Sequence, residues 1–159
     1  MEDIFRHLHM PPELAVQFQA VFSRMEYALK VGGFAVGNEA KVDANWDKFA
    51  NTVNDVFMAI TDPAVVQARE FLLQQPPRKQ VLKEDKVDFK DQVIDKDQRP
   101  AQQVLLMVRT IRNNLFHGGK YLPNGEQEPG RNKDLVAHAL CVLLACSTLY
   151  DDVRFSFDN

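Results

Sequence analysis

Apolar positions along this chain recur at spacings of three and four residues, which is the period of an α-helix. The first such stripe follows Pro11-Pro12 and stops at Gly32-Gly33. Its members are Leu14, Phe18, Phe22, Met25 and Leu29. Proline is tolerated in the first turn of a helix, and glycine often marks the end of one. The pattern therefore predicts a helix between these two pairs.

Two further helices are expected before residue 76. Asp43 or Asn45 can cap the first of them. Its apolar stripe consists of Trp46, Phe49, Val53, Val56, Phe57 and Ile60. Asp62-Pro63 then provides a capping residue followed by a proline at the first helical position, and Pro76-Pro77 ends the shorter helix that follows.

Residues 78–99 differ in character, because seven basic and six acidic residues replace the apolar stripe. A mixed charge run of this kind is typical of a solvated loop, here with room for a short strand or an extra helical turn around Val87-Asp88-Phe89. The alternative is a lid over a binding site.

Helical spacing returns after Pro100. The stripe Val104, Val108, Ile111 and Leu115 predicts a helix that ends at Gly118-Gly119. A last helix, capped by Asp134 and apolar nearly all round, is expected to run to about Tyr150, buried in the core or in a subunit interface. We therefore predict an all-α bundle of four to five helices with short connections, formed as one domain by residues 1–159.

Composition narrows the classes of function. The net charge of −3 and the pI of about 5.8 exclude a globally basic nucleic-acid binder. We expect no membrane-spanning segment and no signal peptide, because long uncharged apolar runs are missing. Cys141 and Cys146 would lie about 140° apart on a helix and so cannot bridge each other. Two core thiols suit a reducing compartment, so we expect a cytoplasmic protein.

The candidate chemistry lies in residues 108–120, VRTIRNNLFHGGK. On a helix, Arg109, Asn113 and His117 form a row on the polar side, and Arg112 lies at the shoulder of the apolar stripe. Residues 99–133 also hold six basic residues against two acidic ones. This local surplus could attract a phosphate backbone, although ordinary surface variation accounts for it equally well.

These residue types suffice for cleavage of RNA without a metal. A histidine exchanges a proton near neutral pH, an arginine fork matches phosphate oxygens, and an asparagine amide can fix either. The histidine would deprotonate the 2′-hydroxyl or protonate the leaving oxygen, while the arginine stabilises charge at phosphorus. The expected product carries a 2′,3′-cyclic phosphate, because no water nucleophile is activated. No ligand cluster lies nearby, so we predict neither a metal nor another cofactor.

The spacing of an arginine and a following histidine is weak evidence by itself. About 0.7 such matches are expected by chance in this chain. Arg131 and His138 also satisfy it, and we interpret that pair as a chance match. A histidine at the end of a helix also suits the helix dipole without any catalytic role.

The segment RNNLFHGGK, between a periodic helix and a wholly apolar one, resembles the signature of the HEPN superfamily. That motif is an arginine, four to six residues and a histidine, often with a polar residue directly after the arginine. Arg112, Asn113 and His117 match these positions. The resemblance implies a helical bundle and a metal-independent endoribonuclease, with these three as catalytic residues. It also implies a homodimer in which two motifs share one cleft.

The biological setting that the resemblance implies is a prokaryotic toxin–antitoxin or phage-defence system. The protein would be the toxin or antiviral component, restrained by an antitoxin such as a minimal nucleotidyltransferase. RNA is then the expected substrate, and we assign Arg109 and Lys120, from the basic surplus, to substrate binding.

Other interpretations stay open. A catalytically inactive HEPN module would bind nucleotide, RNA or a partner protein through the same cleft. A purely structural domain would hold Arg112 and His117 apart and satisfy each separately. Glu26, at the edge of the first apolar stripe, could orient Arg112 by an ion pair or be an ordinary boundary residue.

Overall fold

Helices form most of the computed structural model, which describes residues 2–122 and 124–159. The described residues form six α-helices, a short 3-10 helix at Glu2–Phe5 and two antiparallel hairpins of two strands each. The helices are α1 (Pro12–Val31), α2 (Trp46–Met58), α3 (Pro63–Gln74), α4 (Pro100–Phe116), α5 (Arg131–Cys146) and α6 (Asp151–Asp158). The strands are β1 (Ala35–Asn38), β2 (Lys41–Ala44), β3 (Lys79–Lys83) and β4 (Lys86–Lys90).

The start signals in the sequence identified α1 to α4 correctly, but the predicted cap of the last long helix was wrong, because α5 begins at Arg131 after Gly130 and Asp134 lies inside its first turn. Helix α1 begins at the second proline of Pro11-Pro12 and ends before Gly32, as the stripe predicts. Of the two caps considered for α2, the structure uses Asn45, whose side chain accepts a hydrogen bond from the backbone N–H of Lys48 at 3.0 Å. Asp62 caps α3 by accepting from the backbone of Ala64 at 2.9 Å. These side chains satisfy backbone donors that a helix start leaves without partners.

The prediction of a purely helical fold was wrong in two places. Residues 35–44 and 79–90 each form a hairpin. The second lies inside the charged run predicted to be a loop, and its strand β4 contains Val87-Asp88-Phe89, where the sequence left room for a short strand. All but one of the residues in the first hairpin are exposed, so burial imposes no alternation of apolar and polar residues on its sequence. The first hairpin therefore lacks the usual signature of a strand, and the second shows it only briefly, at Val87-Asp88-Phe89.

The count of four or five helices was also low. Helix α5 ends at Cys146, short of the predicted Tyr150, and α6 follows as a separate helix. Ser147 follows the last residue of α5, and its hydroxyl donates to the backbone oxygen of Leu144 at 2.8 Å. Hydroxyl groups that bond locally to backbone in this way compete with helix continuation.

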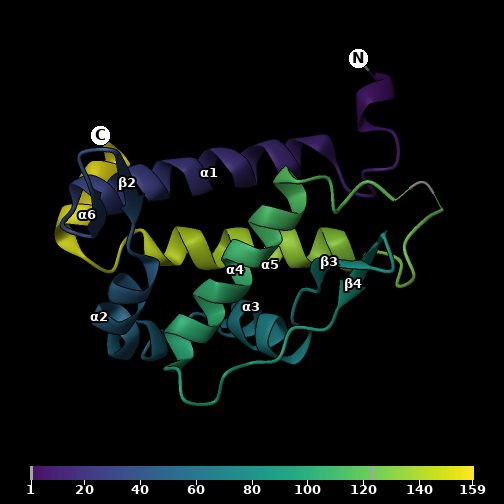
Figure 1. The fold of residues 1–159 in the computed structure, drawn as a ribbon. Helices are drawn as coiled ribbons and strands as arrows, with labels where there is room; N and C mark the ends of the chain where they lie inside the picture. Colours follow the sequence, from purple (N-terminus) through teal and green to yellow (C-terminus); the bar gives the residue numbers. More distant parts are fainter. Residues whose placement is uncertain (1, 123) are drawn as a thin grey trace.

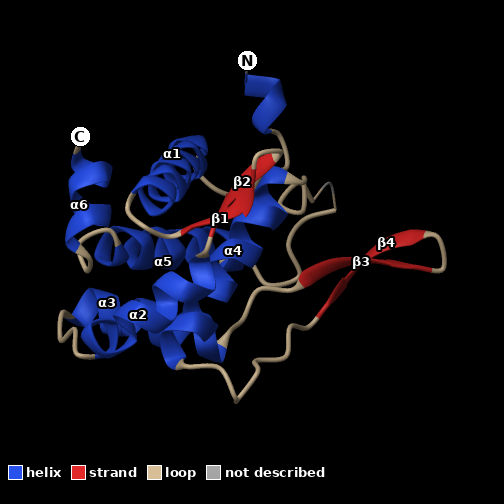
Figure 2. Ribbon diagram, turned by 60° about the vertical axis from the view of Figure 1, so that its left-hand side comes forward, coloured by secondary structure: helices blue, strands red, loops and turns tan. Residues whose placement is uncertain are grey.

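The helices enclose one apolar core (Figure 1). Helix α1 packs along α5 and against α6, α4 packs against α2, and α3 packs against α5. The largest fully buried side chains are Phe18, Phe49, Phe57, Met25 and Leu29. Figure 2 shows the β3–β4 hairpin projecting away from this helical body. Cys141 and Cys146 are both free, as their predicted angular separation requires.

No single helix among the described residues is long and apolar enough to cross a membrane. Helices α5 and α6 pass that test only when taken together, and they are bent by 114° at the break between them.

Candidate active site

The three residues of the motif lie at the exposed end of α4. Helix α4 ends at Phe116, and the backbone N–H of His117, the next residue, donates to the carbonyl of Asn113 at 2.9 Å. Gly118 then adopts a φ of +80°, which favours glycine and turns the chain away from the helix. Asn113 and His117 are exposed and Arg112 is half-buried, so the helix end presents all three to the surface.

The guanidinium of Arg112 lies against two aromatic rings. Its central carbon is 5.4 Å from the centroid of the Phe22 ring and 4.9 Å from that of Phe116. One terminal nitrogen donates to the side-chain oxygen of Asn113 at 3.1 Å. Nε is buried and has no hydrogen-bond partner, and no carboxylate among the described residues forms an ion pair with this arginine. The cation is thus held in place by rings and one amide, with its charge unpaired.

These contacts belong to a ladder of stacked side chains that runs from the core to the surface. The Phe22 ring stacks on Trp46 with their centroids 5.1 Å apart, and Arg112 lies over Phe22. At the outer end, the Phe116 ring meets the His117 ring edge-on with centroids 5.2 Å apart. Trp46 and Phe22 are each 3% exposed, whereas Phe116 is 62% exposed. The sequence placed Phe22 and Trp46 in the core but gave no sign that they support Arg112.

Arg112 and His117 are close because both contact Phe116. The two distances to this ring place the guanidinium carbon and the imidazole centroid no more than about 10 Å apart. A single phosphodiester can reach both groups across such a gap, since each hydrogen bond spans about 3 Å.

Glu26 does not orient Arg112. Its carboxylate accepts a hydrogen bond from the indole nitrogen of Trp46 at 3.1 Å. It acts on the opposite end of the ladder, where it fixes the ring on which Phe22 stacks.

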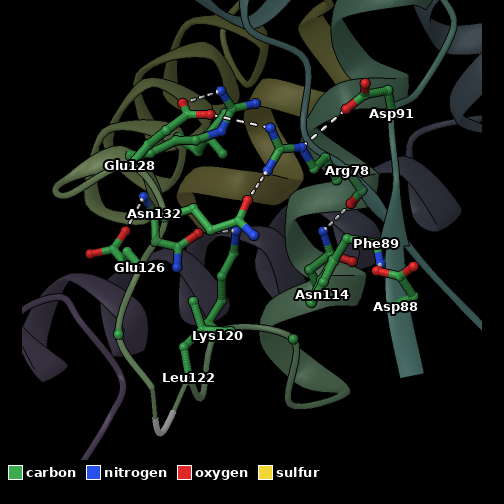
Figure 3. Close-up of a pocket in the computed structure, with 15 residues that line it drawn as sticks. Arg78, Asp88, Phe89, Asp91, Asn114, Lys120, Leu122, Glu126, Glu128 and Asn132 are labelled. Atoms are coloured by element: carbon green, nitrogen blue, oxygen red, sulfur yellow. Dashed lines mark hydrogen bonds and ion pairs between the residues drawn. The ribbon is translucent and has the colours of Figure 1, made fainter. Parts of the chain in front are cut away.

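The two residues predicted to bind substrate lie in different surroundings. Arg109 is one turn back along α4 and forms an ion pair with Asp47 at 3.5 Å. Lys120 is only 4% exposed and lies in a cavity on the side of the β3–β4 hairpin (Figure 3). Of the five predicted site residues, the structure gathers Arg112, Asn113 and His117 at one point. It pairs Arg109 with α2 and buries Lys120.

The cavity around Lys120 measures about 450 Å³ and lies between β4, the segment 119–128 and the start of α5 (Figure 3). The Lys120 ammonium donates to the side-chain oxygen of Asn132 at 2.8 Å. The pKa of Lys120 is lowered from 10.5 to about 8, chiefly by burial and to a smaller extent by the nearby charge of Arg131, while Glu126 opposes the shift. Removing an ammonium from water disfavours its charged form, which explains the direction of the change.

Ion pairs centred on Glu128 form part of the wall of this cavity. Arg131 approaches this carboxylate at 2.9 Å and Arg78 at 3.2 Å, and Arg78 also binds Asp91 at 3.0 Å. The hydrogen bond and the charge of Arg131 lower the pKa of Glu128, with a smaller contribution from Arg78. These contacts tie the base of the hairpin to the segment that leads into α5.

A second hollow, of about 580 Å³, lies beside Phe116, between α1 and the end of α4. Its lining is largely apolar and includes the exposed side chains of Val16 (61% exposed), Phe116 and Tyr121 (41% exposed). Exposed apolar surface of this kind, next to charged residues, is typical of a protein interface.

The residues that the structure describes contain no group of three or more histidine, cysteine, aspartate or glutamate side chains placed to hold a metal ion. Comparison with protein-family models, curated proteins and solved structures gives no match to this chain.

Proposed function

We propose that this protein is a metal-independent endoribonuclease of the HEPN type, with its centre at Arg112, Asn113 and His117. The observation that carries the proposal is that Arg112 and His117 flank one exposed ring at the end of α4, while no carboxylate in residues 2–122 and 124–159 forms an ion pair with the arginine. An unpaired guanidinium beside an exposed imidazole is better placed to bind and react with a phosphodiester than to serve only in packing the protein core.

The role of each residue follows from its contacts. The terminal nitrogens of Arg112 would bind the phosphate oxygens as charge develops at phosphorus, whereas its Nε is buried and out of reach of a substrate. Asn113 fixes the guanidinium through its hydrogen bond at 3.1 Å. His117 is exposed, so its ring can move a proton from the 2′-hydroxyl or to the leaving oxygen.

The proposal includes a second copy of the chain facing the first. The family resemblance implies this arrangement, and the apolar hollow beside Phe116 supports it, because it adjoins the candidate centre. A twofold axis here would bring two Arg112–His117 pairs to one cleft. The size of the assembly in solution tests this part independently.

The decisive experiment is cleavage of a mixed RNA substrate in EDTA. We expect the wild-type protein to cleave and to leave 2′,3′-cyclic phosphate ends. His117→Ala should lose activity by about 10²-fold to 10⁴-fold, the range usual for a general acid or base. Arg112→Ala should lose about 10²-fold to 10³-fold, the range usual for one group that stabilises charge in the transition state. His138→Ala is the matched histidine control, because His138 packs on Phe71 and lies away from the motif. Arg154→Ala, on α6, is the arginine control.

Equal cleavage by all variants would refute the assignment. An absence of cleavage by the folded wild-type protein, across RNA of varied sequence, would instead favour the inactive binding module. Far-UV circular dichroism on each variant separates loss of activity from loss of fold.

A further inference from the structure

The β3–β4 hairpin sorts its charges by face, which the sequence of residues 78–99 does not reveal on its own. Neighbouring residues of a strand point to opposite faces, and residues paired across two strands share a face. The register pairs Lys79 with Lys90 and Lys83 with Lys86, and Val81 with Asp88 between them. Four lysines therefore lie on one face, which we call the lysine face. The opposite face holds Gln80, Leu82, Val87 and Phe89.

The lysine face is positively charged and unpaired. All four lysines are exposed, and none lies in an ion pair with a described residue. Three acidic residues lie nearby. Asp88 shares the face and its carboxylate accepts from the backbone N–H of Phe89 at 2.7 Å, while Glu84 and Asp85 form the turn. The four cations therefore outnumber the one carboxylate on their face.

This arrangement is unfavourable for an isolated hairpin. Like charges directly opposite each other on paired strands destabilise the pairing, and here it happens twice. The turn adds strain, because Glu84 and Asp85 adopt φ values of 51° and 60°, a region that favours glycine or asparagine. A polyanion laid along the face would relieve the repulsion between the lysines.

The base of the hairpin is also joined to the helix that carries the candidate centre, through one side-chain hydrogen bond. The side-chain amide of Asn114, next to Asn113 in the chain, donates to the carbonyl of Arg78 at 2.7 Å. Arg78 directly precedes β3 and clamps Asp91, which directly follows β4. The base of the hairpin is thus fixed at the end of α4, while its tip projects away from the bundle (Figure 2).

We propose that the lysine face binds the phosphate backbone of the RNA substrate and so delivers the strand to the end of α4. This inference rests on the proposed function for its choice of RNA. The two lysine pairs lie about 13 Å apart along the strands, since each residue advances a strand by about 3.3 Å. That length corresponds to about four stacked nucleotides. The contacts would be to phosphates, so the face would select for charge and not for sequence.

The test uses the full chain carrying His117→Ala, so that RNA stays intact, and fluorescence anisotropy with labelled single-stranded RNA over a range of salt concentrations. The four lysines are replaced together by glutamine. The matched control replaces Lys30, Lys41, Lys48 and Lys133, which lie on α1, β2, α2 and α5, and changes the net charge equally. We expect the hairpin variant to lose on the order of 10²-fold in affinity at about 0.1 M salt. The slope of log affinity against log salt concentration should be smaller in magnitude by about three. The control variant should show little change in affinity or in this slope.

Several outcomes would overturn the proposal. One is RNA binding by the hairpin variant that equals the binding of the control, and another is no RNA binding by the parent protein. Tighter binding of polyglutamate or of phosphatidylserine vesicles than of RNA, lost with the same lysines, would assign the face to a different partner. Circular dichroism confirms that the hairpin variant keeps its helices.

Failure of this proposal can be told apart from failure of the proposed function. Loss of RNA affinity in the hairpin variant, when the wild-type protein never cleaves RNA, supports the lysine face and refutes the ribonuclease. Cleavage by the wild-type protein, with unchanged kcat/KM and unchanged salt dependence in the hairpin variant, supports the ribonuclease and refutes the lysine face.

Discussion

Replacement of Lys120 by methionine should stabilise the protein at neutral pH. Lys120 is 4% exposed and has one hydrogen-bond partner, Asn132. Its pKa falls from 10.5 to about 8 on folding, so the folded state binds a proton at Lys120 more weakly than the unfolded state does. Methionine fills a similar volume without a charge.

The magnitude follows from linkage between folding and proton binding. The shift corresponds to about 3.4 kcal/mol of destabilisation well below pH 8, at 1.36 kcal/mol per pKa unit. Loss of the hydrogen bond to Asn132 costs about 1 kcal/mol in return. Lys120→Met should therefore be more stable than the wild-type protein by about 2 kcal/mol near pH 7.

The sign of the pH dependence is equally specific. Between pH 8 and pH 10.5 the unfolded state holds more protons on Lys120 than the folded state, so the stability of the wild-type protein rises relative to the variant. The advantage of the variant should shrink by about 1.4 kcal/mol between about pH 7 and about pH 9. Burial raises the pKa of Cys146 to about 12, which lowers stability at high pH, but this effect is common to both proteins and cancels.

Urea unfolding followed by circular dichroism, at several pH values in this window, measures the difference. Lys133→Met, at an exposed position on the same helix as Asn132, should show a stability difference that does not depend on pH. A Lys120→Met protein that is less stable than the wild-type protein at pH 7, or a difference that stays constant up to pH 9, would refute the reasoning.

Three further outcomes follow from the structure. Asp62→Ala should cost about 1 kcal/mol of stability in urea unfolding, because it removes the cap of α3, whereas Asp62→Asn should cost much less. Phe57→Ala should cost about 3 to 5 kcal/mol in the same assay, since this ring is fully buried; a smaller loss would mean that the core collapses around the gap. Because the pKa of Glu128 is lowered in the folded state, its carboxylate stabilises the protein above about pH 4.5, and this stabilisation is lost as the pH falls. In Glu128→Gln the free energy of unfolding should therefore decrease less steeply on acidification below that pH. An unchanged dependence of stability on acidic pH would contradict this.

Sequence reasoning succeeded where the physical signal is local. The limits of α1 follow from a proline pair, an apolar stripe and a glycine pair, each of which acts within a few residues. The position of the motif on the end of a helix followed in the same way, because Gly118 breaks the helical spacing directly after His117.

The pairing of strands into hairpins could not be predicted because these strands bury little. Strand prediction depends on alternation between a buried and an exposed face, and every residue of β4 is exposed. The turn at Glu84-Asp85 also lacks the asparagine or glycine that usually marks two-residue hairpins. Only the brief alternation Val87-Asp88-Phe89 indicated a strand, and it did not identify the partner strand.

The surroundings of the site were hidden for a different reason. Lys120 meets Asn132 across the loop between α4 and α5, and Glu26 meets Trp46 across a hairpin. Such contacts depend on how distant segments pack, and spacing within one helix contains no information about them. The support of Arg112 by Phe22 is of the same kind.

The ladder from Trp46 to His117 gives the protein an optical probe of its own. Trp46 is the single tryptophan in the chain, and its ring stacks on Phe22. The guanidinium of Arg112 also lies over the Phe22 ring. A phosphate that draws the guanidinium off Phe22 changes the surroundings of the one indole that emits. Occupation of the site can thus be followed by intrinsic fluorescence on unlabelled protein, with Arg112→Ala as the silent reference.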